Sequence, residues 1–153
     1  MNISFHIVTD RPSLAALAPR ATEDLSALAT AVKPTSKPVT EDSLADLFSS
    51  GAAIAVALDD GRIVGTAYLC RLVKCNDYTW RLEHVATLPS HERRGIARTI
   101  IRMLYAYGAE KKPDGYCEHT CESFRVGANG LYASLGCKKR DTNVWRYIFS
   151  SAA

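Results

Sequence analysis

The sequence has no long apolar run and little excess charge of either sign. Its longest uncharged apolar stretch, residues 52–58, has the length of a strand, far below the about 20 residues that a membrane-spanning helix needs. Lys and Arg number 19 and Asp and Glu 16, so the formal net charge is only +3. This balance disfavours a general binder of nucleic acid or membrane surfaces. We therefore expect neither nucleic acid nor a membrane among the partners.

Other common signatures are missing as well. The first ten residues lack the basic and apolar segments of a secretory signal, so we expect a cytoplasmic protein. The 5 cysteines form no C-x-x-C pair, which argues against a disulfide framework and the common zinc spacings. Neither a G-x-S-x-G elbow nor a Walker-type loop occurs, which removes the usual signatures of serine hydrolases and nucleoside triphosphatases.

What remains is ordinary globular composition with a clear order of elements. With 153 residues, 47% of them hydrophobic, we expect one folded domain over residues 1–153. Residue patterns predict strands over 3–8, 52–58, 62–73, 79–87 and 116–121, helices over 19–32, 40–48, from 96 onwards and 126–135, and a final hairpin of 137–140 and 144–149. This order predicts a mixed α/β (α+β) sheet, mostly antiparallel, with flanking helices.

A basic glycine turn follows the strand predicted over 79–87 and opens the next helix. Free amide groups at a helix start, together with the helix dipole, form a ready site for a phosphate or pyrophosphate. Gly95 keeps the approach open, and Arg93, Arg94 and Arg98 add cationic side chains. Many helices begin with a glycine and basic residues, so this segment alone is weak evidence for an anion site.

Two longer motifs resemble one known family. The segment 82–89 (LEHVATLP) followed by 92–97 (ERRGIA) is similar to the strand and pyrophosphate loop of the GNAT superfamily of acyl-CoA-dependent N-acyltransferases. The segment 128–137 (ANGLYASLGC) resembles the last helix of that family. The resemblance spans nearly the whole chain, and the two motifs together are more specific than either alone. It implies the GNAT fold, with acetyl-CoA as cosubstrate and no metal.

The resemblance also implies roles for individual positions. Tyr132 lies where many of these enzymes keep a tyrosine that reprotonates the CoA thiolate. Glu92 departs from the family pattern, which often has Gln or Arg at this place, and an acidic side chain near phosphates is unfavourable unless it points to solvent or pairs with an arginine. The resemblance also implies which residues bind acetyl-CoA. They are Val85, Ala86 and Thr87 for the pantetheine arm, Arg93, Arg94, Gly95, Ile96, Ala97 and Arg98 for the pyrophosphate, and Asn129 on the last helix.

Acetyl transfer to an amine needs a general base and is helped by a general acid. Glu83 is the best candidate for the base, although a glutamate on a strand is also often salt-bridged. Tyr132 is the first choice for the acid, and its alternative role is a core tyrosine that packs the helix against the sheet. His84 is expected to point away from Glu83, because strand side chains alternate, unless a bulge turns the strand.

A second cluster is interpreted as structural. Cys117, His119 and Cys121 alternate along one predicted strand and therefore share a face. Three side chains along a straight strand diverge too far to hold one tetrahedral ion, and no fourth ligand has a matching spacing. We expect no metal site here.

We therefore predict an N-acetyltransferase that transfers the acetyl group of acetyl-CoA to a primary amine of a small molecule or peptide by direct attack. The alternative is a non-catalytic acyl-CoA-binding module that senses or scaffolds. The acceptor itself is not readable from the sequence, because fold resemblance does not fix function at that level. A homodimer is compatible with the apolar run 144–149, which fits either a core or an interface.

Overall fold

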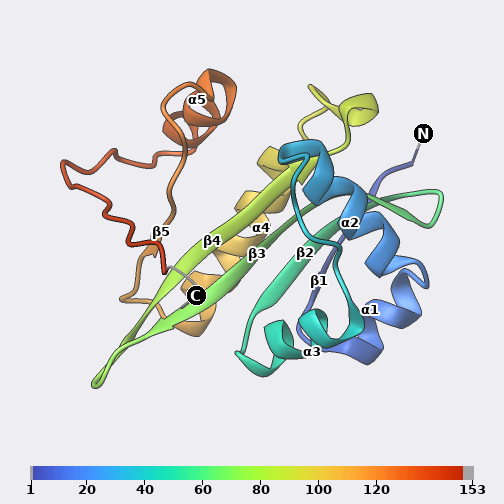
Figure 1. The fold of residues 1–153 in the computed structure, drawn as a ribbon, viewed down its shortest axis with the longest axis horizontal. Coiled ribbons are helices and arrows are strands. Elements are labelled where there is room, and N and C mark those ends of the chain that lie inside the picture. Colours follow the sequence, from blue (N-terminus) through green and yellow to red (C-terminus); the bar gives the residue numbers. More distant parts are fainter. Residues whose placement is uncertain (1, 150–153) are drawn as a thin grey trace. The chain divides into compact units, whose positions relative to one another are not determined.

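A five-stranded sheet organises the computed structural model, which describes residues 2–149 (Figure 1). The strands are β1 (Ser4–Val8), β2 (Ala53–Asp59), β3 (Arg62–Val73), β4 (Tyr78–Thr87) and β5 (Cys117–Glu118), and they neighbour one another in this order. The first four are antiparallel, whereas β5 runs parallel to β4. The helices are α1 (Arg11–Leu17), α2 (Ala21–Val32), α3 (Glu41–Ser49), α4 (Ile96–Lys111) and α5 (Val126–Ser134), with a short 3₁₀ helix, η1 (Pro89–His91).

The chain divides into two compact units, Met1–Thr120 and Cys121–Ala153. The first contains the sheet and the helices α1 to α4, and the second contains α5. In residues 2–149 we find no helix with the length and apolar character needed to span a bilayer.

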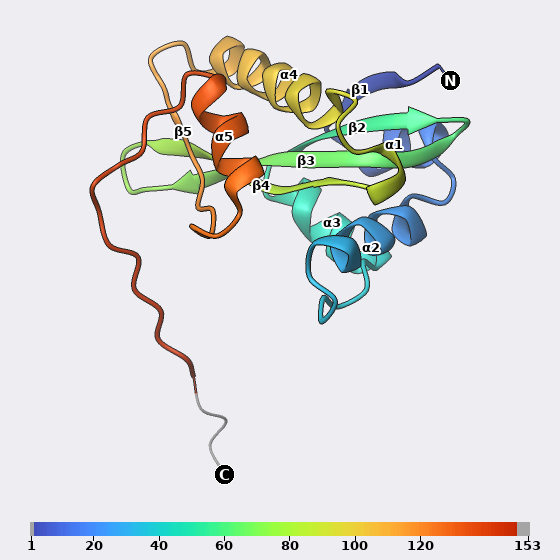
Figure 2. The same cartoon turned by 90° about the horizontal axis from the view of Figure 1, so that it is seen from above.

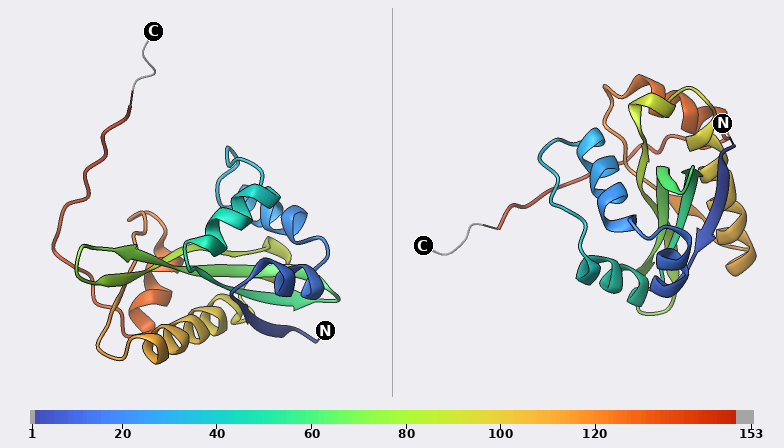
Figure 3. Two further views of the ribbon diagram at one scale, coloured as in Figure 1. Left: turned by 90° about the horizontal axis from the view of Figure 1, so that it is seen from below. Right: turned by 90° about the vertical axis from the view of Figure 1, so that its right-hand side faces the viewer.

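Two helical layers cover the sheet of the first unit. Figure 2 and the right-hand view of Figure 3 show α4 on one face and the group α1 to α3 on the other. On the second face, Leu14, Leu28 and Leu44 of the three helices pack with Ile54 and Val56 of β2 in one buried cluster. The mixed, mostly antiparallel sheet with flanking helices confirms the predicted fold class.

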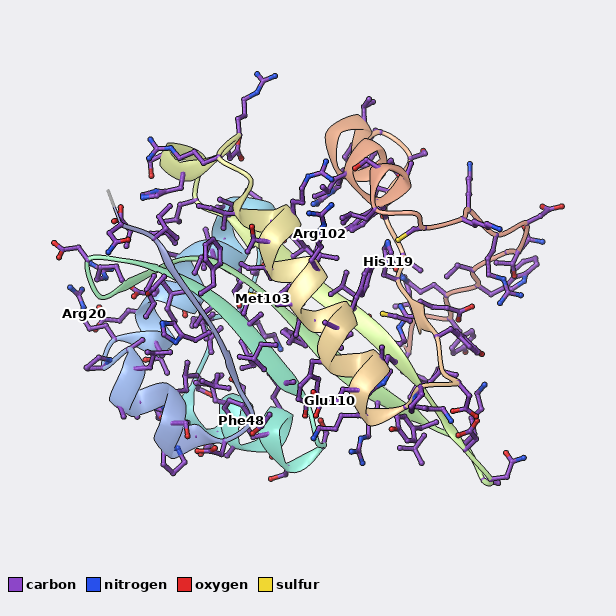
Figure 4. All side chains as sticks on the ribbon, turned by 180° about the vertical axis from the view of Figure 1, so that it is seen from behind. Arg20, Phe48, Arg102, Met103, Glu110 and His119 are labelled. Carbon is purple, nitrogen blue, oxygen red and sulfur yellow. The ribbon has the colours of Figure 1, made fainter. Side chains whose placement is uncertain are left out.

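Two glycines let α4 lie close to the other face of the sheet, which it crosses in Figure 4 from Arg102 to Glu110. Gly65 of β3 faces Ile96 at the start of the helix. Gly108, near the helix end, faces Trp80 of β4, whose Nε1 donates a hydrogen bond to the Gly108 carbonyl at 3.2 Å. The start of α4 is therefore held firmly against β3.

Gly65→Ala is expected to destabilise the protein, because a Cβ at this position would lie 2.5 Å from Cγ2 of Ile96 and 3.3 Å from Cδ1 of Ile100. Overpacking of this kind typically costs about 1–3 kcal/mol of unfolding free energy. Thermal and denaturant unfolding measure the change. Gly127→Ala in α5 is the matched control, since its added Cβ would meet nothing within 4 Å and should leave stability equal or slightly higher. Equal stability of the two variants would contradict the close approach of α4.

Several predicted elements need correction. The helix α1 was not predicted, because its short sequence gives little periodicity; Asp10 begins it by accepting a hydrogen bond from the Ser13 amide at 2.8 Å. The strand predicted over 116–121 is reduced to the two residues of β5. The final hairpin of 137–140 and 144–149 is wrong: these residues form neither strand nor helix. Their alternating apolar pattern is that of a strand, but they form no ladder with another strand.

Candidate functional site

One edge of β4 is unpaired over most of its length. The strand β5 pairs with β4 only at Trp80 and Arg81. Within residues 2–149, no strand pairs with this edge beyond that point. The predicted pantetheine-binding residues, Val85 to Thr87, lie along the free part, as the last residues of β4. Unpaired backbone N–H and C=O groups on a strand edge can bind an extended ligand as an additional strand would.

A β-bulge interrupts β4 just before these residues. Tyr68 of β3 pairs with Glu83 and Thr66 pairs with Ala86, so one residue of β3 faces two of β4, His84 and Val85. His84 has a positive φ of 52°. Its ring stacks on that of Tyr68, with centroids 5.2 Å apart.

The bulge changes the expected direction of His84. Directly paired residues of an antiparallel ladder present their side chains on the same face, so Tyr68 lies on the face of Glu83. Because the His84 ring stacks on Tyr68, it also turns towards that face. The expectation that His84 points away from Glu83 applies to a regular strand and is wrong for this one. The alternation of residues in the sequence gives no sign of the bulge.

The turn before α4 has the backbone geometry of an anion site. Gly95 caps the helix with φ 77°, and Arg93 also has a positive φ, 61°. No side chain among the described residues caps the helix start. The first amide groups of the helix, those of Ile96 and Ala97, therefore have no side-chain acceptor of the usual capping kind. A phosphate group placed there would satisfy them and interact favourably with the helix dipole.

Contacts on both sides hold this loop in place. His91 of η1 is hydrogen-bonded through Nε2 to Oδ2 of Asp59 at 3.0 Å, and through Nδ1 to Oγ of Ser90 at 2.8 Å. Asp59 ends β2, so this contact ties the loop to the β2–β3 turn. On the far side, Ile96 is 2% exposed and packs against Gly65. The loop conformation is thus fixed by the first unit itself.

Polar side chains gather on β3 and β4 beside the bulge. Arg81 donates two hydrogen bonds, from Nε and Nη2, to Oε1 of Glu83, each at 3.1 Å. Glu83 is thus salt-bridged, as the alternative interpretation of a strand glutamate proposed. Burial, and then the charge of Glu83, raises the pKa of Cys70 to about 11. The pKa of Tyr68 is also raised, chiefly by burial, and burial followed by the charge of Arg81 lowers the pKa of His119.

Two features of the first unit are compatible with acetyl-CoA, the cosubstrate that the resemblance implies. The Thr87 hydroxyl is buried and has no hydrogen-bond partner among the described residues. Thr87 is the last residue of β4, and its ladder partner Gly65 packs against Ile96 at the uncapped start of α4. A free strand edge and an uncapped helix start are the two features that an extended arm ending in a pyrophosphate requires.

The second unit presents the predicted acid on α5. Its helix ends in a Schellman motif: Gly136 has φ 86°, the Cys137 amide donates to the Tyr132 carbonyl at 3.1 Å, and the Gly136 amide donates to the Ala133 carbonyl at 3.0 Å. Tyr132 is half-buried, and this motif fixes its backbone. Asn129 donates from Nδ2 to the carbonyls of residues 122 and 125, at 2.9 and 3.0 Å. Its amide therefore supports the start of α5, and its contact with the cofactor stays a prediction.

The cysteine and histidine cluster does not form a strand face. Cys117 lies in β5, whereas His119 (labelled in Figure 4) and Cys121 follow it. In the described part of the chain, no group of three or more His, Cys, Asp or Glu side chains is placed to hold a metal ion.

Comparisons with known proteins agree on one family. The model of the acetyltransferase (GNAT) domain matches residues 50–138, whereas no curated protein sequence matches. Among solved structures, an aminoglycoside acetyltransferase from an uncultured soil metagenomic sample, in complex with trehalose, superposes with a TM-score of 0.76 at 19% identity, covering 97% of each chain. A Trypanosoma brucei acetyltransferase gives 0.72 at 17% identity, covering 96% of this chain and 100% of that one.

A third similar structure contains a CoA derivative. It is AAC(6′)-Iy in complex with the bisubstrate analogue CoA-S-monomethyl-acetylneamine, with a TM-score of 0.71 at 17% identity, covering 98% of this chain and 100% of that one. At such identities the likeness shows the fold. The family model, however, covers more than half of the chain, from residue 50 to residue 138. The chain therefore belongs to the GNAT acetyltransferase family.

Proposed function

We propose that this acetyltransferase transfers the acetyl group of acetyl-CoA to a primary amine of a small molecule or peptide by direct attack. The observation that carries the proposal is the closeness of two features: the free edge of β4 ends at Thr87, and its ladder partner Gly65 packs against Ile96 at the uncapped start of α4. One feature suits the pantetheine arm and the other the pyrophosphate. We also propose that residues 1–153 act as one N-acetyltransferase domain.

Binding is assigned to backbone groups more than to side chains. The backbone of Val85, Ala86 and Thr87 would pair with the pantetheine arm. The amides of residues 93–98 would hold the pyrophosphate, with Arg93, Arg94 and Arg98 contributing charge. Arg93 and Arg94 are exposed, so a ligand at this loop can reach their side chains. Asn129 on α5 is proposed as a further contact.

Acetyl-CoA supplies the activated acetyl group as a thioester. The protein must then orient the amine, keep its nitrogen unprotonated and provide a proton for the departing thiolate. Tyr132 is proposed as the acid. Glu83 is proposed to act on the amine side, where a carboxylate attracts a cationic acceptor. Backbone N–H groups at the bulge are suited to polarise the thioester carbonyl.

The test is an acceptor screen that follows free thiol release from acetyl-CoA, with mass spectrometry of the products. We expect acetylation of at least one class of primary amine, and no transfer to matched tertiary amines. Calorimetric binding of acetyl-CoA is measured in parallel. Binding without transfer to any amine would instead support the non-catalytic acyl-CoA-binding module.

A further inference from the structure

We propose that His84, and not Glu83, is the general base that takes the proton from the acceptor amine. Glu83 would then remain an ion-paired carboxylate that attracts the amine. The proposal rests on the proposed acetyltransferase function. Its evidence lies in the position of His84 along β4, in its backbone conformation, and in what surrounds each of the two side chains.

The position of His84 follows from the direction of β4. The loop suited to the pyrophosphate follows the C-terminal end of this strand. A pantetheine arm that leaves the loop and runs back along the free edge passes Thr87, then Ala86, then Val85. The next residue is His84. The end of the arm, which carries the thioester, therefore reaches the strand at the bulge.

The backbone at His84 is unusual for a residue with a side chain. Its φ of 52° lies in the left-handed region, where residues other than glycine are uncommon, although histidine is enriched there among them. Such conformations persist where the surrounding structure holds them, and they cluster at functional sites. Here the bulge moves the imidazole out of the strand alternation and onto the face of Tyr68 and Glu83.

The ring of His84 is held in place and is still accessible. Its stacking on Tyr68, with an interplanar angle of 29°, limits its rotation. Burial raises the pKa of Tyr68, so this phenol stays neutral and does not compete for the proton. His84 itself is exposed, so an amine can approach it. The titratable and charged groups facing this part of the sheet are Tyr68 and Cys70 on β3, Arg81 and Glu83 on β4, and His119 after β5.

Glu83 is placed differently. One of its oxygens already accepts two N–H groups from the Arg81 guanidinium. Charge-assisted bonds of this kind are among the stronger hydrogen bonds in proteins, so this oxygen is already occupied by a cation. Among the described residues, no carboxylate forms an ion pair with the imidazole of His84, whose ring stacks on Tyr68. A neutral imidazole is the side chain that most readily accepts a proton near neutral pH.

In the proposed step, the acetyl group moves from the CoA sulfur to the amine nitrogen. The unprotonated amine nitrogen forms a C–N bond to the thioester carbon, and the C–S bond breaks with its electron pair on sulfur. The proton lost by nitrogen goes to the His84 imidazole, and the thiolate takes a proton from the Tyr132 hydroxyl. Transfer of the imidazolium proton through solvent to the tyrosinate restores both groups. The products are the N-acetyl amine and CoA.

Three variants test the assignment on the best acceptor from the screen. His84→Asn keeps a residue that tolerates positive φ but cannot act as a base, and His84→Gly leaves a space for added imidazole. We expect His84→Asn to lower kcat/KM about 100-fold. In this variant, kcat/KM should no longer rise with pH through the neutral range. We expect added imidazole to restore part of the activity of His84→Gly. Glu83→Gln should mainly raise KM for the amine and keep the pH profile.

Acetyl-CoA affinity and thermal unfolding of each variant report whether it is folded, and they should match wild type. The proposal is overturned if His84→Asn keeps the wild-type pH profile together with a kcat/KM within threefold of wild type. It is also overturned if the rise of kcat/KM through neutral pH is lost in Glu83→Gln and kept in His84→Asn. Lack of imidazole rescue in a folded, acetyl-CoA-binding His84→Gly also counts against it. Absence of acetyl transfer by the wild-type protein would instead overturn the proposed function, and this inference with it.

Discussion

Tyr132→Phe is expected to lower kcat about 100-fold or more, the usual contribution of a positioned general acid, and to leave the affinity for acetyl-CoA unchanged. The substitution removes only the hydroxyl that we propose to protonate the departing thiolate. The ring stays, so packing around α5 is preserved. The Schellman motif at the end of α5 uses the backbone of Tyr132, and it is also unaffected. Steady-state kinetics and calorimetric titration with acetyl-CoA separate the two effects.

A second tyrosine provides the control. Tyr107 lies on α4, where its ring contacts Trp80 edge to face with centroids 6.3 Å apart. Tyr107→Phe removes a hydroxyl of the same kind outside the proposed site and should keep wild-type kcat. If Tyr132→Phe is as active as Tyr107→Phe, the tyrosine is a packing residue, as its alternative interpretation holds. The proposal of acetyl transfer would survive that result, but the acid would have to be another group.

The parts of the fold that the sequence predicts well are those set by local chemistry. The Asp-Gly pair predicts the β2–β3 turn, and both of its central residues, Asp60 and Gly61, have the positive φ that a type I′ turn requires. Gly95 and Gly136 likewise mark the start of α4 and the end of α5 with positive φ. In each case a glycine is needed at one backbone position, so a single residue carries the signal.

The remaining features depend on partners distant in sequence. The bulge at His84 arises from the register between β3 and β4, and no local pattern encodes a register. The short length of β5 and the absence of the predicted final hairpin among the described residues have the same cause. Alternating apolar residues permit a strand, but a strand forms only where a neighbouring strand pairs with it. Val144, Trp145 and Phe149 are 77%, 89% and 89% exposed, although their pattern resembles a half-buried strand. For the candidate site, the sequence therefore predicted the glycine turn at the start of α4 but missed the direction of His84. The role of that turn as an anion site stays a prediction.

Gly95→Val is expected to weaken acetyl-CoA binding about 10-fold, since about 1.4 kcal/mol corresponds to a tenfold change in affinity. A β-branched residue is a genuine outlier at positive φ, where L-residues pay about 1–2 kcal/mol, and Gly95 has φ 77°. The backbone must therefore change at the helix cap, and the first amides of α4 then no longer converge on one anion. S-Acetylpantetheine lacks the pyrophosphate, so its binding or its use as acetyl donor should change little. Titration with both donors measures the difference.

Gly61→Val separates this effect from general strain. Gly61 has nearly the same φ, 76°, and, as at Gly95, an added Cβ would meet nothing within 4 Å. The two substitutions should therefore lower thermal stability to a similar extent, while only the one at Gly95 changes the affinity for acetyl-CoA. Equal loss of affinity in both variants would mean that the loop responds to stability alone. An equal loss of affinity for acetyl-CoA and S-acetylpantetheine in Gly95→Val would mean that the start of α4 does not hold the pyrophosphate.

Because binding there is assigned to backbone amides, loss of a single exposed arginine such as Arg93 should weaken acetyl-CoA binding far less than the change at Gly95.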